Sequence, residues 1–304
     1  FQLTEDAAST ALLNNLALIL FLSPMIFLSP LAGQLADRAD KSKMMAKNKI
    51  AEMLICLLAT AAFALNSSYF MLLVLFLLGA QSAMFGPNKY AFLPQILPKN
   101  LILSGNAVIA TGTFAAISLG VLLGGLIATH EDIWYIAGPL MFLIAYMGYR
   151  ATLAFPSVER GSPDLKLDAN LFRQALKGIE FARTDRPIWV CMLGLSWFWA
   201  LSSIVLTQIP AFTRYVLGGD ITAVTALITV FIVGLALGAF LSTRTDGSRT
   251  EPGLIPIALI GMIAACAALA IDPAITERMQ SLKAIMFQRS GQQAAIGILL
   301  FGIF

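Results

Sequence analysis

Three polar residues in an otherwise apolar stretch are the first groups in this sequence that could do chemistry. Gln81 and Asn88 are seven residues apart and share one face of a predicted helix, and Lys89 follows directly. A lysine ammonium at this position could bind a phosphate as a point charge. It could equally anchor the helix by extending its charged head to a polar surface. Pro87 interrupts backbone hydrogen bonding, which predicts that the helix closes here.

A second polar face is predicted on a helix over 187–215. Pro210 has no N–H to donate to the carbonyl of Leu206, so the helix should kink or open beside Gln208. A freed carbonyl next to an amide is a plausible substrate contact, although helix packing alone would also explain the hydroxyls on this face. The residues on or beside the face are Ser196, Trp197, Trp199, Ser203, Thr207 and Arg214.

A third set lies in the run 101–128, where Asn106 and Thr113 share a face with two glycines. Small residues four apart allow two helices to approach closely. Helix packing is therefore the role predicted for Gly120, Gly124 and Gly125.

Several kinds of chemistry have no support in the sequence. There is one histidine, His130, and neither a G-x-S-x-G nor a G-x-x-x-x-G-K motif. The three cysteines share no metal-ligand spacing. We therefore predict no catalytic residues, no metal and no cofactor.

The composition identifies the environment of these residues. The chain is 58% hydrophobic and 12% charged, against about 25% charged residues in soluble domains. We therefore predict an all-α integral membrane protein whose partner is the lipid bilayer and not a nucleic acid. The predicted spans are 11–35, 44–65, 69–88, 101–128, 133–154, 187–215, 221–242 and 253–271, with another beginning near 293.

Basic residues alternate between the loops and predict the topology. Of the 20 lysines and arginines, 16 lie in the first, third, fifth and seventh gaps or in the ends of the spans that flank them. Under the positive-inside rule these gaps are cytoplasmic and residue 1 is outside. The predicted spans show no evident embedded carboxylate of the kind that ion-driven transporters use.

The first gap carries the most ordered motif, G-Q-L-A-D-R-A-D-K from Gly33 to Lys41. It resembles the loop signature of the major facilitator superfamily, G-x-L-A-D-R-x-G-R-K, between that family's second and third helices. Asp40 stands where the family usually has glycine, which predicts a looser turn. The matching residues are Gly33, Asp37, Arg38 and Lys41.

This resemblance implies an order for the helices. The chain would be a fragment that covers helices two to nine and the start of helix ten, with helix one missing. Residues 1–154 would form the N-terminal half, 155–186 a cytoplasmic linker and 187–304 the truncated C-terminal half. Within the linker, apolar residues recur at helical spacing from Phe172 to Ile179, which predicts an amphipathic helix.

Two further stretches narrow the resemblance. G-P-N-K-Y-A-F-L-P-Q (86–95) is similar to a segment of the bacterial lysophospholipid transporters. L-S-W-F-W (195–199) and the sequence that follows it resemble helix seven of the branch fused to an acyltransferase and an acyl–carrier-protein ligase.

The resemblance implies a transporter of the bacterial cytoplasmic membrane that moves lysophosphatidylethanolamine from the outer to the inner leaflet by alternating access. A fused or associated acyltransferase would restore the second chain. Lys89 would contact the phosphate, and Asp37 with Arg38 would hold a cytoplasmic gate through charge-assisted hydrogen bonds. The substrate route would be lined by Gln81, Asn88, Asn106, Trp197 and Gln208.

Two alternatives stay open at this stage. One is a drug or siderophore exporter of the same fold. The other is a membrane anchor for fused lipid enzymes that transports nothing itself.

Overall fold

The computed structural model describes residues 7–128, 134–158, 161–162, 164–165, 167–168, 170–242, 254–271 and 289–303. These residues form helices joined by short connections, and no strand occurs among them. The first five α-helices are α1 (Ala7–Arg38), α2 (Lys41–Ala64), α3 (Ser68–Ile96), α4 (Ile102–Ala128) and α5 (Ala137–Thr152). They are followed by α6 (Leu171–Thr184), α7 (Arg186–Ala211), α8 (Ile221–Ser242), α9 (Leu254–Ile271) and α11 (Arg289–Ile303). Three short helices are η1 (Lys99–Leu101), η2 (Trp134–Ile136) and η3 (Phe212–Val216).

Each predicted span is helical, and the predicted linker helix is α6. Among the described residues, five helices are long and apolar enough to cross a membrane: Leu16–Arg38, Ser68–Ile96, Lys99–Ile127, Arg186–Val216 and Thr222–Leu241. The rest of the predicted spans are shorter or, like α2, carry more charge. The segment 272–288 lies outside the described residues.

The chain divides into two compact units. The first unit comprises 1–97 and 130–185, and the second comprises 98–129 and 186–304. The helix α4 therefore groups with the C-terminal helices. The predicted division at residues 154 and 186 stays a prediction.

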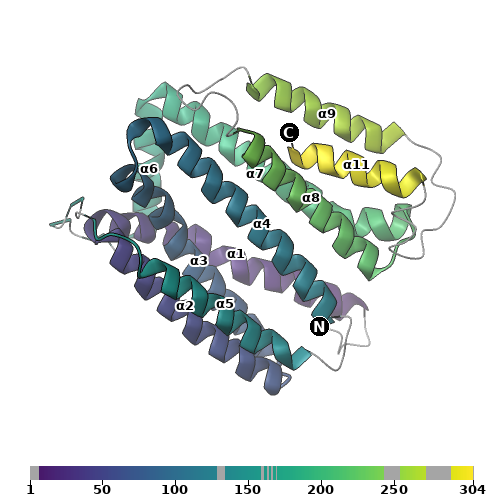
Figure 1. Ribbon diagram of the computed structural model, residues 1–304, viewed down its shortest axis with the longest axis horizontal. Helices are drawn as coiled ribbons and strands as arrows, with labels where there is room; N and C mark the ends of the chain where they lie inside the picture. The colour runs from purple at the N-terminus through teal and green to yellow at the C-terminus, as the bar shows by residue number, and fades with distance from the viewer. Residues whose placement is uncertain are drawn as a thin grey trace. The chain divides into compact units, whose positions relative to one another are not determined.

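In the first unit, α1 packs along α3, and α2 packs along both α3 and α5 (Figure 1). Ile55, Ala59 and Ala62 of α2 meet Val74 of α3 in a small buried cluster. The linker helix α6 contacts α1.

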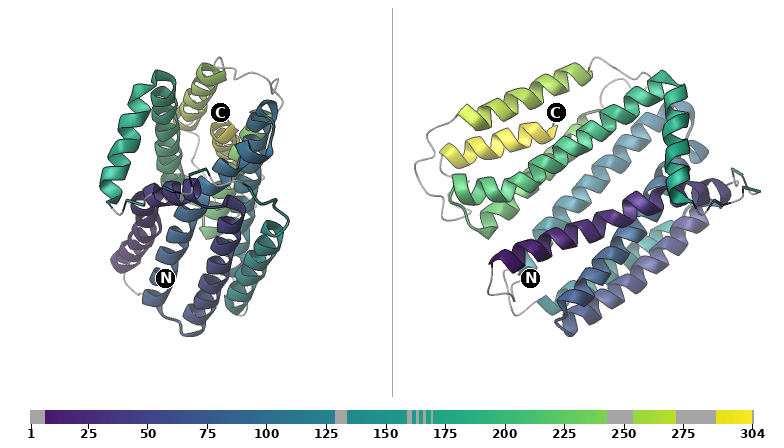
Figure 2. Two further views of the ribbon diagram at one scale, coloured as in Figure 1. Left: turned by 90° about the vertical axis from the view of Figure 1, so that its left-hand side faces the viewer. Right: turned by 180° about the vertical axis from the view of Figure 1, so that it is seen from behind.

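In the second unit, α8 is the central helix and packs against both α4 and α11, and α11 also packs against α9 (Figure 2). The buried apolar residues of this unit include Leu227 and Phe231 on α8 and Ile298 and Phe301 on α11. Glycines bring α8 and α11 close together. An added Cβ on Gly234 would lie 2.5 Å from the carbonyl oxygen of Leu299, and one on Gly302 would lie 2.5 Å from that of Phe231.

Two prolines test the predicted helix breaks. The prediction that α3 closes at Pro87 is wrong, because the helix continues to Ile96 with Pro94 also inside it. Each proline removes one backbone donor, and the backbone hydrogen bonds on either side of it continue the helix. Pro210 also lies inside its helix, because α7 continues past Gln208 to Ala211. The opening predicted beside Gln208 is therefore wrong, and the predicted kink stays a prediction. The π-helix η3 follows only at Phe212, where the N–H of Leu217 donates to the carbonyl of Phe212 at 3.1 Å.

Candidate functional site

Several side-chain hydrogen bonds join different segments of the first unit near the point where α1 ends and α2 begins, which we call the hinge end of the first unit. The turn itself is closed. Asp40 caps α2 and has an extended backbone conformation, with φ −67° and ψ 114°. Its carboxylate accepts hydrogen bonds from the N–H of Ser42 (3.0 Å), from the hydroxyl of Ser42 (2.7 Å) and from the N–H of Lys43 (3.4 Å). The predicted looser turn is therefore wrong. The backbone angles of Asp40 suit any residue, so this position does not need a glycine. The Asp40 side chain also caps the helix, which a glycine could not do.

Hydrogen bonds stabilise the charged form of the Asp40 carboxyl. Burial raises its pKa, but the hydrogen bonds from Ser42 and Lys43 outweigh burial and lower the pKa below its usual value. Lys43 lies 3.7 Å from the same carboxylate and is largely exposed. Asp40 is thus ionised at neutral pH and serves the turn.

Two rungs of hydrogen bonds join α2 to α3, and we call them the α2–α3 seam. Asn88 is fully buried, and its Nδ2 donates to the backbone carbonyl of Lys41 at 2.9 Å. Seven residues away on each helix, Nδ2 of Asn48 donates to the carbonyl of Gln81 at 3.2 Å. Gln81 and Asn88 do share one helix face, and that face meets α2. Asn88 could contact a substrate only if the seam separated.

An ion pair extends the seam. Both Nζ of Lys49 and Nε2 of Gln81 donate to Oε2 of Glu52, each at 2.7 Å. The side chains of Lys49 and Glu52 are 20% and 19% exposed. Glu52 is eleven residues into α2, or roughly 16 Å along the helix axis. A lysine and an amide compensate the charge of Glu52, and the prediction that the spans embed no carboxylate at membrane depth stays a prediction.

Lys49 and Lys89 both approach aromatic rings on α3. Nζ of Lys49 lies 5.0 Å from the ring centre of Phe85, and Nζ of Lys89 lies 5.0 Å from that of Tyr90. Such contacts stabilise a cation at a site with little water. Lys89 is half-buried, and its role as a phosphate contact stays a prediction.

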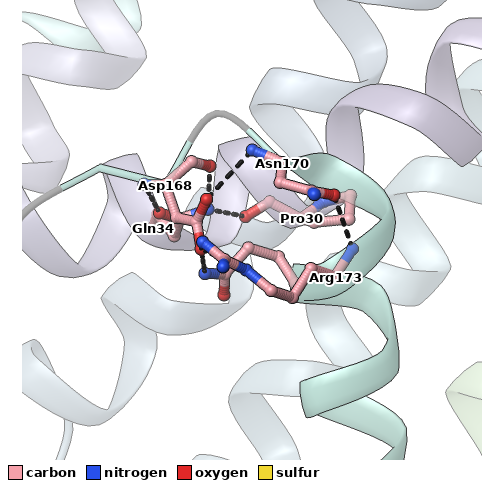
Figure 3. A network of polar contacts seen from close by, with 6 residues as sticks. Pro30, Gln34, Asp168, Asn170 and Arg173 are labelled. Carbon is pink, nitrogen blue, oxygen red and sulfur yellow. Dashed lines mark hydrogen bonds and ion pairs between the residues drawn. The ribbon is translucent and has the colours of Figure 1, made fainter.

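A second set of hydrogen bonds, which we call the clasp, ties the linker to α1 (Figure 3). Oε1 of Gln34 accepts from the N–H of Asp168 at 2.8 Å, and its Nε2 lies 3.4 Å from the Asp168 carbonyl. The Asp168 carboxylate in turn accepts from the N–H of Asn170 (3.0 Å), from Nε of Arg173 (3.0 Å) and from Nε2 of Gln174 (2.8 Å). These hydrogen bonds lower the pKa of Asp168 to about 2.

The four residues of the predicted gate motif all lie at the hinge end. The carbonyl of Asp37 accepts from the N–H of Ser162 at 2.8 Å, which adds a backbone contact to the clasp. Lys41 is buried under the Asn88 amide, while Asp37 and Arg38 are exposed. The ion pairs found among the described residues involve neither Asp37 nor Arg38, so their gate role stays a prediction.

A cavity of about 590 Å³ opens beside the hinge. The end of α1, the first two turns of α2 and one residue of α3 form its wall. It is lined by Leu35, Arg38, Ala39, Asp40, Lys43, Met44, Lys47, Asn48 and Met84.

The predicted polar face of α7 lies in the second unit, and its hydroxyls bond within their own helix. Ser196 donates to the carbonyl of Met192 at 2.8 Å, and Ser203 to that of Trp199 at 2.7 Å. Trp197 is 62% exposed, and Gln208 is exposed as well. Both side chains are therefore exposed, and their contact with a substrate stays a prediction.

On α4, Asn106 is half-buried, and the glycines differ from one another. A Cβ on Gly125 would lie 2.6 Å from Cγ2 of Thr225 on α8, so this glycine permits close packing. A Cβ on Gly120 or Gly124 would meet no described atom within 4 Å. The packing role of these two residues stays a prediction.

Sequence reasoning missed the clasp and the partners of Glu52. Gln34 and Asp168 are 134 residues apart, and no local pattern links them. For Glu52 a signal was present, since it is a lone acid inside an apolar run with a lysine three residues before it.

The comparison with protein families agrees with the helical architecture and the hinge motif. The sequence profile described as Major Facilitator Superfamily matches residues 2–303. The chain therefore belongs to this superfamily of membrane transporters.

Curated relatives carry a more particular name. The lysophospholipid transporter LplT of Cronobacter sakazakii is 27% identical over 80% of this chain and 61% of its own length. The protein of the same name from Serratia proteamaculans is 26% identical over 82% of this chain, and that from Escherichia coli K12 is 25% identical over 81%. The chain spans about three fifths of the length of these relatives.

Proposed function

We propose that this chain belongs to a transporter of lysophospholipids, chiefly lysophosphatidylethanolamine. Transport would run from the outer to the inner leaflet of the bacterial cytoplasmic membrane. The observation that carries the proposal is the similarity to proteins named lysophospholipid transporters over about four fifths of the chain. We extend to the whole protein an activity inferred from this part of it.

The proposed mechanism is alternating access. It requires two bodies that move relative to each other, and the chain has two compact units. It also requires contacts that favour one of the two states. The hinge end supplies two candidates, Asp37 and Arg38, whose side chains are exposed there.

We assign the substrate roles as follows. The Lys89 ammonium holds the phosphate, and Asp37 with Arg38 forms a gate on the cytoplasmic side. Gln81, Asn106, Trp197 and Gln208 line the head-group route, and Asn88 joins them when the α2–α3 seam opens. A fused or associated acyltransferase then restores the second acyl chain of the imported lipid.

The first test is uptake of labelled lysophosphatidylethanolamine by spheroplasts that express the full-length gene. We expect uptake that depends on the protein and falls in the Asp37→Asn variant, which keeps the side-chain shape and removes the charge. Protein in the membrane without uptake would contradict the proposal and favour an exporter of another substrate or a non-transporting anchor. Protection of cells from a drug would then distinguish the exporter.

The Lys89→Ala variant tests the phosphate contact. Loss of a charge-assisted hydrogen bond worth about 1.5–3 kcal/mol predicts at least a tenfold drop in uptake per inserted protein. Lys177→Ala on α6 is the matched control, because Lys177 is exposed and lies outside the hinge end. Parallel loss of membrane abundance and uptake would make Lys89 a structural residue.

A further inference from the structure

The hinge cavity has a chemical character that the proposed transport does not use. We propose that it binds the phosphate of an anionic phospholipid from the surrounding leaflet, with the glycerol and the start of an acyl chain against its apolar wall. This site goes beyond the proposed function, because the transported lipid is zwitterionic and the bound lipid would carry a net negative charge.

The cavity wall has a regular origin in the sequence. Its α2 residues recur at helical spacing and form one continuous face, made by Lys43, Met44, Lys47 and Asn48, and the N-cap residue Asp40 adjoins this face. The last turn of α1 adds Arg38 and Leu35, and α3 adds Met84. Two helices that join at a tight turn thus present one mixed surface.

Charge favours an anion at this surface. Arg38, Lys43 and Lys47 line the cavity against a single carboxylate, that of Asp40. This leaves an excess of two positive charges. The Asp40 carboxylate is occupied by Ser42 and Lys43, and the amide of Asn48 is occupied by Gln81. Arg38 and Lys47 are exposed, and the ion pairs found among the described residues involve neither of them.

The apolar wall favours a lipid over a free anion. Leu35, Met44 and Met84 are half-buried, and their side chains line the same cavity as the cations. Inorganic phosphate would satisfy the cations and leave this wall uncovered. Basic pockets between membrane helices bind acidic lipid head groups, and each lysine or arginine contributes about 1 kcal/mol near a membrane surface. A phosphate beside a hydrocarbon chain matches both parts of the wall.

The test is a titration of the purified full-length protein in detergent, followed by native mass spectrometry. The probes are phosphatidylglycerol and phosphatidylethanolamine with identical acyl chains, and inorganic phosphate as a competitor. We expect phosphatidylglycerol to bind more tightly than phosphatidylethanolamine. Lys47→Gln should weaken phosphatidylglycerol binding about fivefold, the equivalent of about 1 kcal/mol. Lys47→Arg should retain it, which also shows that the site tolerates substitution.

Lys177→Gln is the matched control, since it removes the same charge from an exposed position outside the cavity. Equal weakening in Lys177→Gln and Lys47→Gln would overturn the proposal, because the attraction would then be a general effect of net charge. Equal affinity for the two lipids would overturn the preference for an anionic head group. Displacement of the lipid by inorganic phosphate at similar concentration would show that the apolar wall plays no part.

Discussion

The hinge end of the first unit and the helices of the second unit use polar side chains differently. At the hinge end, amides and charges bond between helices, as Gln81 does to Glu52, Asn48 to Gln81 and Asn88 to Lys41, and Gln34 bonds α1 to Asp168 of the linker. In the second unit, hydroxyls bond back to their own helices, as Thr213 does to Ile209 and Thr229 to Thr225. There the helices meet through glycines and apolar side chains.

This difference separates two kinds of stability. Contacts through glycines depend on shape, and they tolerate little change because packed interiors cannot yield. Contacts through charges and amides depend on protonation and on available partners, so they can be exchanged for others. A transporter that switches between states needs contacts of the second kind, and in this chain they gather at the hinge end.

The largest expected effect comes from breaking the ion pair in the first unit. Glu52→Ala leaves the Lys49 ammonium and the Gln81 amide without their shared acceptor. Removing one partner of a fully buried pair costs about 3–5 kcal/mol, which is the upper limit for this partly buried pair. We expect a marked loss of stability in detergent unfolding experiments. Glu180→Ala, at an exposed position on α6, is the control and should change little.

A double variant sharpens this result. Replacing both Lys49 and Glu52 with methionine should recover most of the stability, because no charge is then left unpaired. If the double variant remains as unstable as Glu52→Ala, charge compensation is not the main contribution of the pair. The hydrogen bond from Gln81 to Glu52 would then supply most of the stability.

A smaller effect is expected from the glycines of the second unit. Gly234→Ala would place a methyl group 2.5 Å from the carbonyl oxygen of Leu299, and overpacking of this kind costs about 1–3 kcal/mol. Gly120→Ala makes the same chemical change where no described atom lies within 4 Å. We expect a lower unfolding temperature for the first variant and an equal or higher one for the second. Equal temperatures for the two would show that close packing does not hold α8 against α11.

The sequence predicted the features that depend on neighbouring residues. Apolar runs located the spans, and helical spacing from Phe172 to Ile179 located α6. The missing donor of Pro210 did not open α7 beside Gln208, because the helix continues to Ala211. The seam and the clasp escaped prediction because their partners lie far apart along the chain. The prediction of a looser turn at Asp40 was wrong for another reason. A side-chain cap stabilises this turn without a glycine, and the family motif indicates only which residue is usual there.

The smallest expected effect concerns the clasp. The pKa of Asp168 is lowered from 3.8 to about 2 in the folded protein. Its hydrogen bonds therefore stabilise the folded linker fully only at pH values above the pKa that Asp168 has in the unfolded chain. That contribution is lost as the pH falls from about 4 to about 2. The amide of Arg173, which donates to the Asn170 side chain at 2.9 Å, should therefore exchange with solvent faster at low pH than its intrinsic rate explains. The amide of Phe70 donates to the Ser67 hydroxyl at 3.4 Å and is the control, because its cap has no titrating neighbour in the clasp. Unchanged protection of Arg173 over this range would mean that the backbone contacts at Gln34 and Asp37 hold the linker without the carboxylate, and the hinge end would then resemble the second unit more than we argue.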